Sequence, residues 1–156
     1  MAAKAMEAVD RADYCLPILL HHAYEDHPLD IGHHATISAP HMHAFALQQS
    51  LPVLSRPGPH RVLDVGSGSG YLTTAYAMMD GVERVVGIEH VPQLVEMARQ
   101  NVRKHHADLL DSGKIVLVTG DGRKGYPAEA PYDVIHVGAA APQLPTAVRL
   151  CSHWPT

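Results

Sequence analysis

Two apolar stretches separated by a glycine-rich turn and a helix-length segment constrain the fold more than any other feature of this chain. The first stretch is RVLDV at 61–65, the glycines follow in GSGSG at 66–70, and the second stretch is RVVGIE at 84–89. The intervening segment YLTTAYAMM, at 71–79, has the composition of a helix. This order of strand, loop, helix and strand predicts a βαβ unit with two parallel strands.

Further segments extend this unit into a sheet. IVLVT at 115–119 and DVIHVG at 133–138 predict a third and a fourth strand, and a helix is expected over 92–106 with its apolar residues on one face. Strands that are apolar on both faces are typical of a parallel sheet covered by helices on each side. We therefore expect an α/β, doubly wound parallel sheet with its ligand at the carboxyl ends of the strands.

The N-terminal third carries weaker signals. A helix is expected over 3–13, and a long ordered loop over 15–31, where two prolines and scattered polar residues show no clear period. Ser38-Ala39-Pro40 predicts the start of a helix that reaches about Leu51, because serine is a favoured N-cap and proline suits the first turn.

Composition narrows the class of protein. The 156 residues suit one domain, 1–156, and 12 Lys+Arg against 16 Asp+Glu leave no broad charge for a nucleic acid or an anionic membrane. Cys15 and Cys151 lie far apart, which suits free thiols in a reducing compartment. No stretch has the length and apolarity of a signal peptide or a membrane span. We expect a cytoplasmic monomer with no nucleic-acid or membrane partner.

The glycine turn and three acidic residues indicate the ligand. The spacing G-x-G-x-G differs from the G-x-G-x-x-G of dinucleotide sites, and Asp64 just before it would repel a pyrophosphate but complement an ammonium group. Glu89 ends the next strand, where a carboxylate can bind ribose hydroxyls, and Asp121 ends the third strand between glycines that admit a flat ring. Together they favour S-adenosyl-L-methionine over a nicotinamide cofactor, although each residue alone could be a turn or surface charge.

Histidines and one serine crowd the stretch GHHATISAPHMHAFAL at 32–47, which raises the question of a metal site, a catalytic serine or only a helix start. His41 and His43 would point to opposite sides of a helix, and the adjacent pairs 21–22, 33–34 and 105–106 do not converge easily. We therefore expect no metal site.

Four segments carry a resemblance to a known family: ATISAPHMHA at 35–44, LDVGSGSGYLT at 63–73, NVRK at 101–104 and VTGDGRKGYPAEAPYDVIHVGAAAP at 118–142. With them the chain resembles the protein-L-isoaspartate (D-aspartate) O-methyltransferases, up to about Leu150. The resemblance implies a Rossmann-like fold and a protein repair enzyme. Such an enzyme moves a methyl group from S-adenosyl-L-methionine to the free carboxylate of L-isoaspartyl and D-aspartyl residues in damaged proteins and peptides.

The resemblance also assigns roles to single residues. Ser38 stands at the position of the family's active-site serine, and because a carboxylate is already ionised at neutral pH, that hydroxyl would orient the substrate and no general base is needed. Ser38 as a helix cap is the competing interpretation. Cofactor contacts are implied for Ala35, Thr36, Ile37, Ser38, His43, Asp64, Gly66, Gly68, Ser69, Gly70, Glu89, His90, Val91, Pro92, Gln93, Asp121 and Gly122.

The chain departs from the family pattern at both ends. Relatives begin with additional helical sequence, and after Leu150 they continue with further strands that close the sheet, whereas this sequence runs into CSHWPT. The expectation is an incomplete domain that lacks the last strands and leaves 133–138 at an exposed edge. The alternative function is therefore a non-catalytic fragment that binds adenosine or S-adenosyl-L-methionine.

Overall fold

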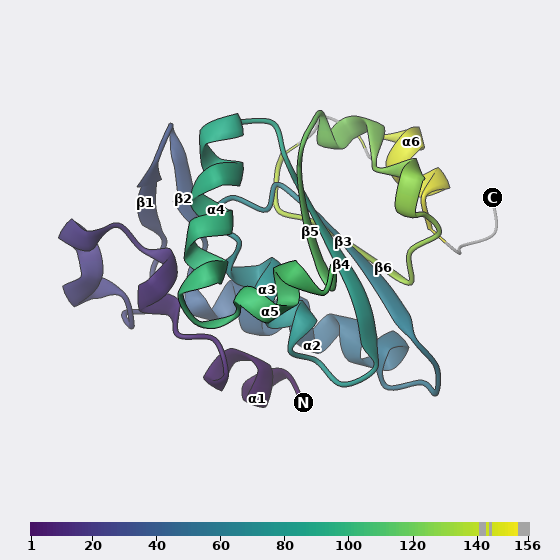
Figure 1. The fold of residues 1–156 in the computed structure, drawn as a ribbon, viewed down its shortest axis with the longest axis horizontal. Coiled ribbons are helices and arrows are strands. Elements are labelled where there is room, and N and C mark those ends of the chain that lie inside the picture. The colour runs from purple at the N-terminus through teal and green to yellow at the C-terminus, as the bar shows by residue number, and fades with distance from the viewer. Residues whose placement is uncertain (141–142, 144, 153–156) are drawn as a thin grey trace.

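A parallel sheet lies at the centre of the computed structural model, which describes residues 1–140, 143 and 145–152 (Figure 1). Its strand order is β5-β4-β3-β6, and each neighbouring pair is parallel. The strands are β3 His60–Val65, β4 Val82–Glu89, β5 Ile115–Thr119 and β6 Val134–Val137. The carboxyl ends of all four strands therefore lie at the same end of the sheet. Strand β6 is an edge strand, as the sequence predicts. The expected α/β fold with a parallel sheet is confirmed.

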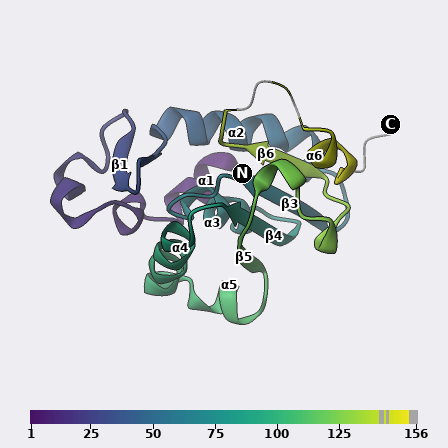
Figure 2. The ribbon, with the colours of Figure 1, turned by 90° about the horizontal axis from the view of Figure 1, so that it is seen from above.

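The larger core cluster fills one face of the sheet. Val62, Val85 and Ile115 belong to it and are 0 to 2 % exposed. Alternate residues of a strand point to the same face, so the residues next to these point to the opposite one. The helices packed against the larger cluster are α1 Ala2–Glu7, α2 Pro40–Leu54, α3 Tyr71–Ala77, α4 Pro92–His105 and α5 Ala107–Asp111. Figure 2 shows α3 and α4 on this side of the sheet.

The opposite face has a smaller cluster. Leu63, Val86 and Ile88 pack there with Tyr132 and Cys151, all of them buried. The covering elements are the short helix α6 Thr146–Leu150 and the loops around the 3-10 turns η3 Gly122–Lys124 and η4 Pro127–Glu129. Figure 2 shows α6 on this side, away from α3 and α4. None of the helices in the described part of the chain has the length and apolarity needed to cross a membrane.

The N-terminal region differs most from its prediction. The first helix ends at Glu7 and not at residue 13, because the Asp10 carboxylate accepts a hydrogen bond from Ala12 N and starts a separate 3-10 turn, η1 Arg11–Tyr14. A second turn, η2 Pro17–His22, follows. The loop expected over 15–31 therefore contains this turn and most of β1 Leu29–Gly32, which forms an antiparallel hairpin with β2 Ala35–Ile37.

The start of α2 corrects another expectation. Ser38 is not the N-cap: Ala39 precedes the helix, and its side chain offers no capping hydrogen bond. The free amide of His41 in the first turn is instead bound by the Asp26 carboxylate, 3.1 Å away and 15 residues earlier in the chain. The helix also continues through Pro52 to Leu54, three residues beyond the expected end. Ala141 and Pro142, the end of one family-like segment, lie outside the described residues.

Candidate functional site

The turn between β3 and α3 takes a backbone shape that requires its glycines. Gly66, Gly68 and Gly70 have φ of 82°, 50° and 87°, in the left-handed region that side chains disfavour. Gly70 serves packing: a Cβ there would lie 3.0 Å from the Ala98 Cβ of α4. Gly66 and Gly68 instead line cavities, and Gly66 N donates to the Ile88 carbonyl at 2.8 Å, which joins the turn to the end of β4.

A small cavity of about 50 Å³ collects most of the predicted residues of the N-terminal segment and of the glycine turn. It lies where the segment after β2 approaches the ends of β3 and β6. Predicted residues that line it are Thr36, Ile37, Ser38, His43, Asp64, Gly66, Gly68 and Ser69. Other lining residues, not predicted, are Ser67, Tyr71, Leu72, His136 and Gly138.

Two buried polar atoms beside this cavity have no hydrogen-bond partner within the described part of the chain. They are His43 Nδ1 and Ser67 Oγ. His43 is 6 % exposed and Ser67 is 7 % exposed. Burial lowers the pKa of His43 to about 4, and the positive charge of Arg11 acts in the same direction. The ring is therefore neutral at pH 7. Because buried polar groups are normally paired, these atoms are available to the polar groups of a ligand.

Asp64 is more tightly held than its sequence pattern suggests. Its residue is 1 % exposed, and Oδ2 accepts a hydrogen bond from Thr73 Oγ1 at 2.6 Å. His136 Nδ1, on the neighbouring β6, donates to Oδ1 at 2.9 Å. Burial would lower the pKa of His136, but the hydrogen bond to Asp64 and the charge of that carboxylate outweigh it and raise the pKa. Asp64 thus forms a charged wall of the small cavity with both oxygens already paired.

Glu89 stabilises the loop after β4. Its Oε2 accepts from Gly68 N at 3.2 Å, and its Oε1 accepts from the amides of His90 at 2.7 Å and Val91 at 3.1 Å. The residue is 6 % exposed and is not among those that line either cavity near the glycine turn. A carboxylate oxygen has two acceptor sites, so Oε2 keeps one beyond its bond to Gly68.

A larger cavity of about 410 Å³ adjoins the small one, since Gly66 lines both. Its predicted residues are Gly66, His90, Asp121 and Gly122. Most of the others are apolar: Val65, Ile88, Val137, Ala139, Ala140, Pro145 and Val148, with Arg123 as a charged neighbour. This volume and lining are typical of a pocket for a small organic ligand.

The rim of the larger cavity has an exposed ion pair. The Arg123 guanidinium donates to the Asp121 carboxylate through Nε and Nη2, at 2.9 Å each, and holds the pKa of that carboxyl down to about 2. Gly122 lies against the sheet, and a Cβ there would come within 2.4 Å of Val65 Cγ1. Only glycine therefore permits this close approach of the loop.

Some predicted contacts lie away from both cavities. The predicted residues that line neither cavity are Ala35, Gly70, Glu89, Val91, Pro92 and Gln93. Ala35 lies in β2, Val91 is half-buried, and Pro92 and Gln93 are exposed in the first turn of α4. Among the lining residues that the sequence analysis missed, Ser67 and His136 bring polar groups to the site. The sequence held a signal for His136, because it is a polar residue in an apolar strand, but its register pairing with Asp64 is seen only in the structure.

Comparisons with known proteins show the family to which the chain is similar. The family model described as protein-L-isoaspartate(D-aspartate) O-methyltransferase matches residues 1–150. The Caenorhabditis elegans protein-L-isoaspartate O-methyltransferase is 50% identical over 145 residues, which are 92% of this chain and 62% of the relative. Protein-L-isoaspartate O-methyltransferase 1 of Arabidopsis thaliana is 51% identical over 148 residues, or 94% of this chain and 63% of the relative.

Among solved structures, a proposed protein-L-isoaspartate O-methyltransferase from Plasmodium falciparum, in complex with S-adenosyl-L-homocysteine, has a TM-score of 0.81 and 36% identity. The match covers 94% of this chain and 69% of that one. The chain thus spans less than two thirds of the length of the two curated relatives, at 62% and 63%.

Proposed function

Because this chain belongs to the protein-L-isoaspartate(D-aspartate) O-methyltransferase family, we propose that it binds S-adenosyl-L-methionine and methylates the free carboxylate of L-isoaspartyl and D-aspartyl residues in damaged proteins. One observation carries the proposal. An apolar cavity and a polar cavity meet at Gly66, and the polar one offers two buried atoms that no described residue pairs. A nucleoside joined to an amino-acid tail needs such a divided site.

The two cavities suit the two parts of this cofactor. The larger one has an apolar lining for the adenosine, with Asp121 and Gly122 at its end and His90 beside it. The tail, with its ammonium and carboxylate groups, would lie along Gly66 and Gly68 and take hydrogen bonds from the small cavity. His43 Nδ1 and Ser67 Oγ are the unpaired atoms there, and Asp64 gives the wall its negative charge.

When bound, the cofactor supplies an electrophilic methyl group on a sulfonium. The substrate carboxylate is the nucleophile, and it is ionised at neutral pH because its reference pKa is near 4. Methyl transfer would exchange the C–S bond of the cofactor for a C–O bond and would move no proton, so this chain would need no general base. What the protein supplies is orientation and exclusion of water.

Ser38 is the residue that we propose for orientation of the substrate. It is exposed, lines the small cavity and has no capping role in α2. Its hydroxyl can donate a hydrogen bond to the substrate carboxylate. Ser38→Ala should therefore lower the rate of methyl transfer while S-adenosyl-L-homocysteine affinity and the free energy of unfolding stay unchanged. An unchanged rate would contradict this role.

Methyl transfer itself is tested with two peptides of equal sequence, one with isoaspartate and one with aspartate, and methyl-labelled S-adenosyl-L-methionine. We expect label on the isoaspartyl peptide only. Equal label on both peptides would contradict the substrate class, and label on neither would contradict methyl transfer.

Binding without turnover is the second candidate. It is favoured because β6, which contributes His136 to the small cavity, is an edge strand of the sheet that the described residues form. Calorimetric titration with S-adenosyl-L-homocysteine distinguishes the two functions: binding without label on either peptide supports this second function, and the absence of binding contradicts both.

A further inference from the structure

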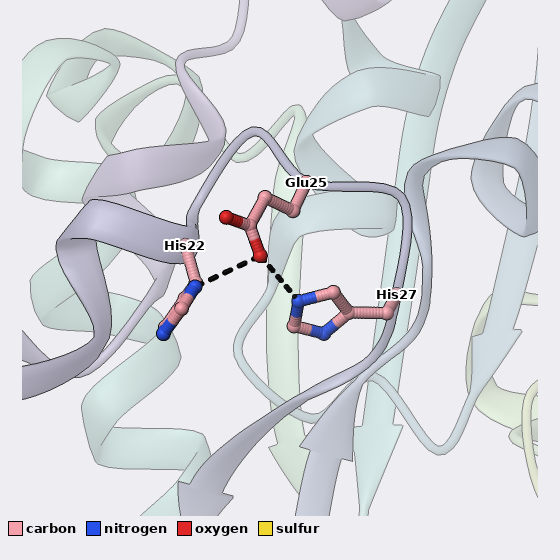
Figure 3. Close-up of side chains that lie close together, drawn as sticks. All are labelled: His22, Glu25 and His27. Carbon is pink, nitrogen blue, oxygen red and sulfur yellow. Dashed lines mark hydrogen bonds and ion pairs between the residues drawn. The ribbon is translucent and has the colours of Figure 1, made fainter.

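Three side chains outside the cofactor region converge on one point. His22 ends the turn η2, and Glu25 and His27 follow in the loop before β1. Figure 3 shows the Glu25 carboxylate between the two imidazole rings: Oε2 lies 2.8 Å from His22 Nδ1 and 2.8 Å from His27 Nε2. One donor atom from each residue lies within 4.8 Å of the other two.

The hydrogen bond of His27 Nδ1 determines which ring nitrogen can bind a ligand. Nδ1 lies 2.9 Å from the Pro28 carbonyl oxygen, which can only accept, so Nδ1 carries the hydrogen. In the neutral ring the lone pair is then on Nε2, and it points at a carboxylate oxygen that is also an acceptor. A proton on Nε2 or a metal ion between the two groups satisfies both, and the metal ion would take the place of that proton. A histidine that donates its other N–H to a carbonyl is also the usual arrangement of a metal ligand.

The loop is held in this shape by a buried arginine. Arg11, 5 % exposed, donates from Nε to the Ala23 carbonyl at 2.9 Å and from Nη2 to the His27 carbonyl at 3.4 Å, so it ties both ends of the segment. Glu25 N donates to the His22 carbonyl at 3.0 Å inside it. Little backbone order therefore has to be gained when a ligand binds.

We propose that His22 Nδ1, Glu25 and His27 Nε2 bind one divalent transition-metal ion of the Zn²⁺ type, with water in the remaining position. Two imidazoles and one carboxylate suit Zn²⁺, whereas Mg²⁺ and Ca²⁺ prefer oxygen ligands. Ligand bonds of about 2.0–2.1 Å place tetrahedral ligand atoms about 3.4 Å apart. The three side chains are 39 %, 53 % and 45 % exposed, so they can open from 2.8 Å to that spacing.

The test is a calorimetric titration with Zn²⁺ alone, without cofactor, in a buffer that does not bind the metal. It compares the wild-type chain with His22→Gln, Glu25→Gln and His27→Gln. Because the chain has 13 histidines, His105→Gln is the matched control: this histidine is also exposed and near a carboxylate, Asp13, but lies on α4.

We expect one Zn²⁺ per chain at the loop and a loss of affinity of at least about tenfold in each of the three loop variants, because loss of a ligand's outer hydrogen-bond partner already costs that much in other metal sites. His105→Gln should keep the wild-type affinity. Circular dichroism checks that every variant is folded. The proposal is overturned if Zn²⁺ does not bind, or if folded His27→Gln binds it as tightly as the wild type. Methyl transfer is not needed for this readout, so the result is independent of the proposed function.

Discussion

The two cavities that meet at Gly66 each have one carboxylate in their lining, buried in the small cavity and half-exposed in the larger one. Asp64, in the small cavity, is 1 % exposed and is paired on both oxygens with Thr73 and His136. Asp121, on the rim of the larger cavity, pairs with the exposed Arg123. Both residues follow from the same sequence pattern, an acid at a strand end. An acid at a strand end can therefore belong to the folded core or to the rim of a ligand site. Substitution of a core acid lowers the free energy of unfolding, whereas substitution of a rim acid lowers the affinity for the ligand.

The largest effect is expected for Asp64→Ala. Removal of the carboxylate leaves the Thr73 hydroxyl and His136 Nδ1 without their acceptor in the protein interior. Breaking a buried pair of this kind costs about 3–5 kcal/mol of unfolding free energy. Urea denaturation at pH 7 measures the loss. A variant as stable as the wild type would contradict the claim that Asp64 belongs to the core.

Acid should destabilise the small cavity through His43. Its pKa is lowered to about 4 in the folded chain, from 6.5, so between these values the unfolded chain binds a proton that the folded chain does not. Stability is therefore lost as pH falls from about 6.5 towards 4, on the order of 2–3 kcal/mol at pH 4.5. His43→Asn should lose less between pH 7 and 4.5 in urea denaturation, and the Asp64–His136 pair is common to both chains. Parallel pH profiles would refute this cause.

Gly122→Ala tests the wall of the larger cavity. A Cβ at 2.4 Å from Val65 Cγ1 forces the loop away from the sheet, which should cost about 1–3 kcal/mol and weaken S-adenosyl-L-homocysteine binding. Gly120→Ala is the matched control, since its Cβ would meet only the flexible end of Ile88 at 3.1 Å. Thermal unfolding and calorimetric titration compare the two. Equal behaviour would mean that the approach of Gly122 to the sheet is unimportant.

Asp121→Asn should have the smallest effect on stability. The carboxylate is half-exposed and its Arg123 partner is exposed; the stabilisation by this pair is fully present above the unfolded pKa of the carboxyl and is lost as pH falls through its folded pKa of about 2. At pH 7 we expect an unchanged urea midpoint and weaker binding of S-adenosyl-L-homocysteine in a titration. A large loss of stability with unchanged binding would reverse the comparison with Asp64.

The sheet could be predicted from the sequence because each strand is a short apolar run bounded by turn residues. The hairpin of β1 and β2 could not, because its turn is His33-His34, with φ of 53° and 59°, where Asn-Gly would be the usual signal. The sequence also predicted the wrong N-cap for α2, Ser38, because it shows only local capping signals. The residue that binds the first-turn amide, Asp26, lies 15 positions away, and no local pattern reveals it.

The site was predicted in part for the same physical reasons. The glycine turn and the acids are local motifs, and most of them do line the cavities. His136 reaches the site through strand pairing with β3, which depends on the sheet order. Sequence adjacency and helical spacing do not reveal the convergence of His22, Glu25 and His27, because a turn brings these three together.

The structure of the chain with S-adenosyl-L-homocysteine bound tests the central claim most directly, that the two cavities form one cofactor site. We predict the adenosine in the larger cavity, between Val65 and Val148, and the amino-acid tail within hydrogen-bond reach of His43 Nδ1 and Ser67 Oγ. A ligand bound away from Gly66, or a tail that leaves both of those atoms unpaired, would contradict the account.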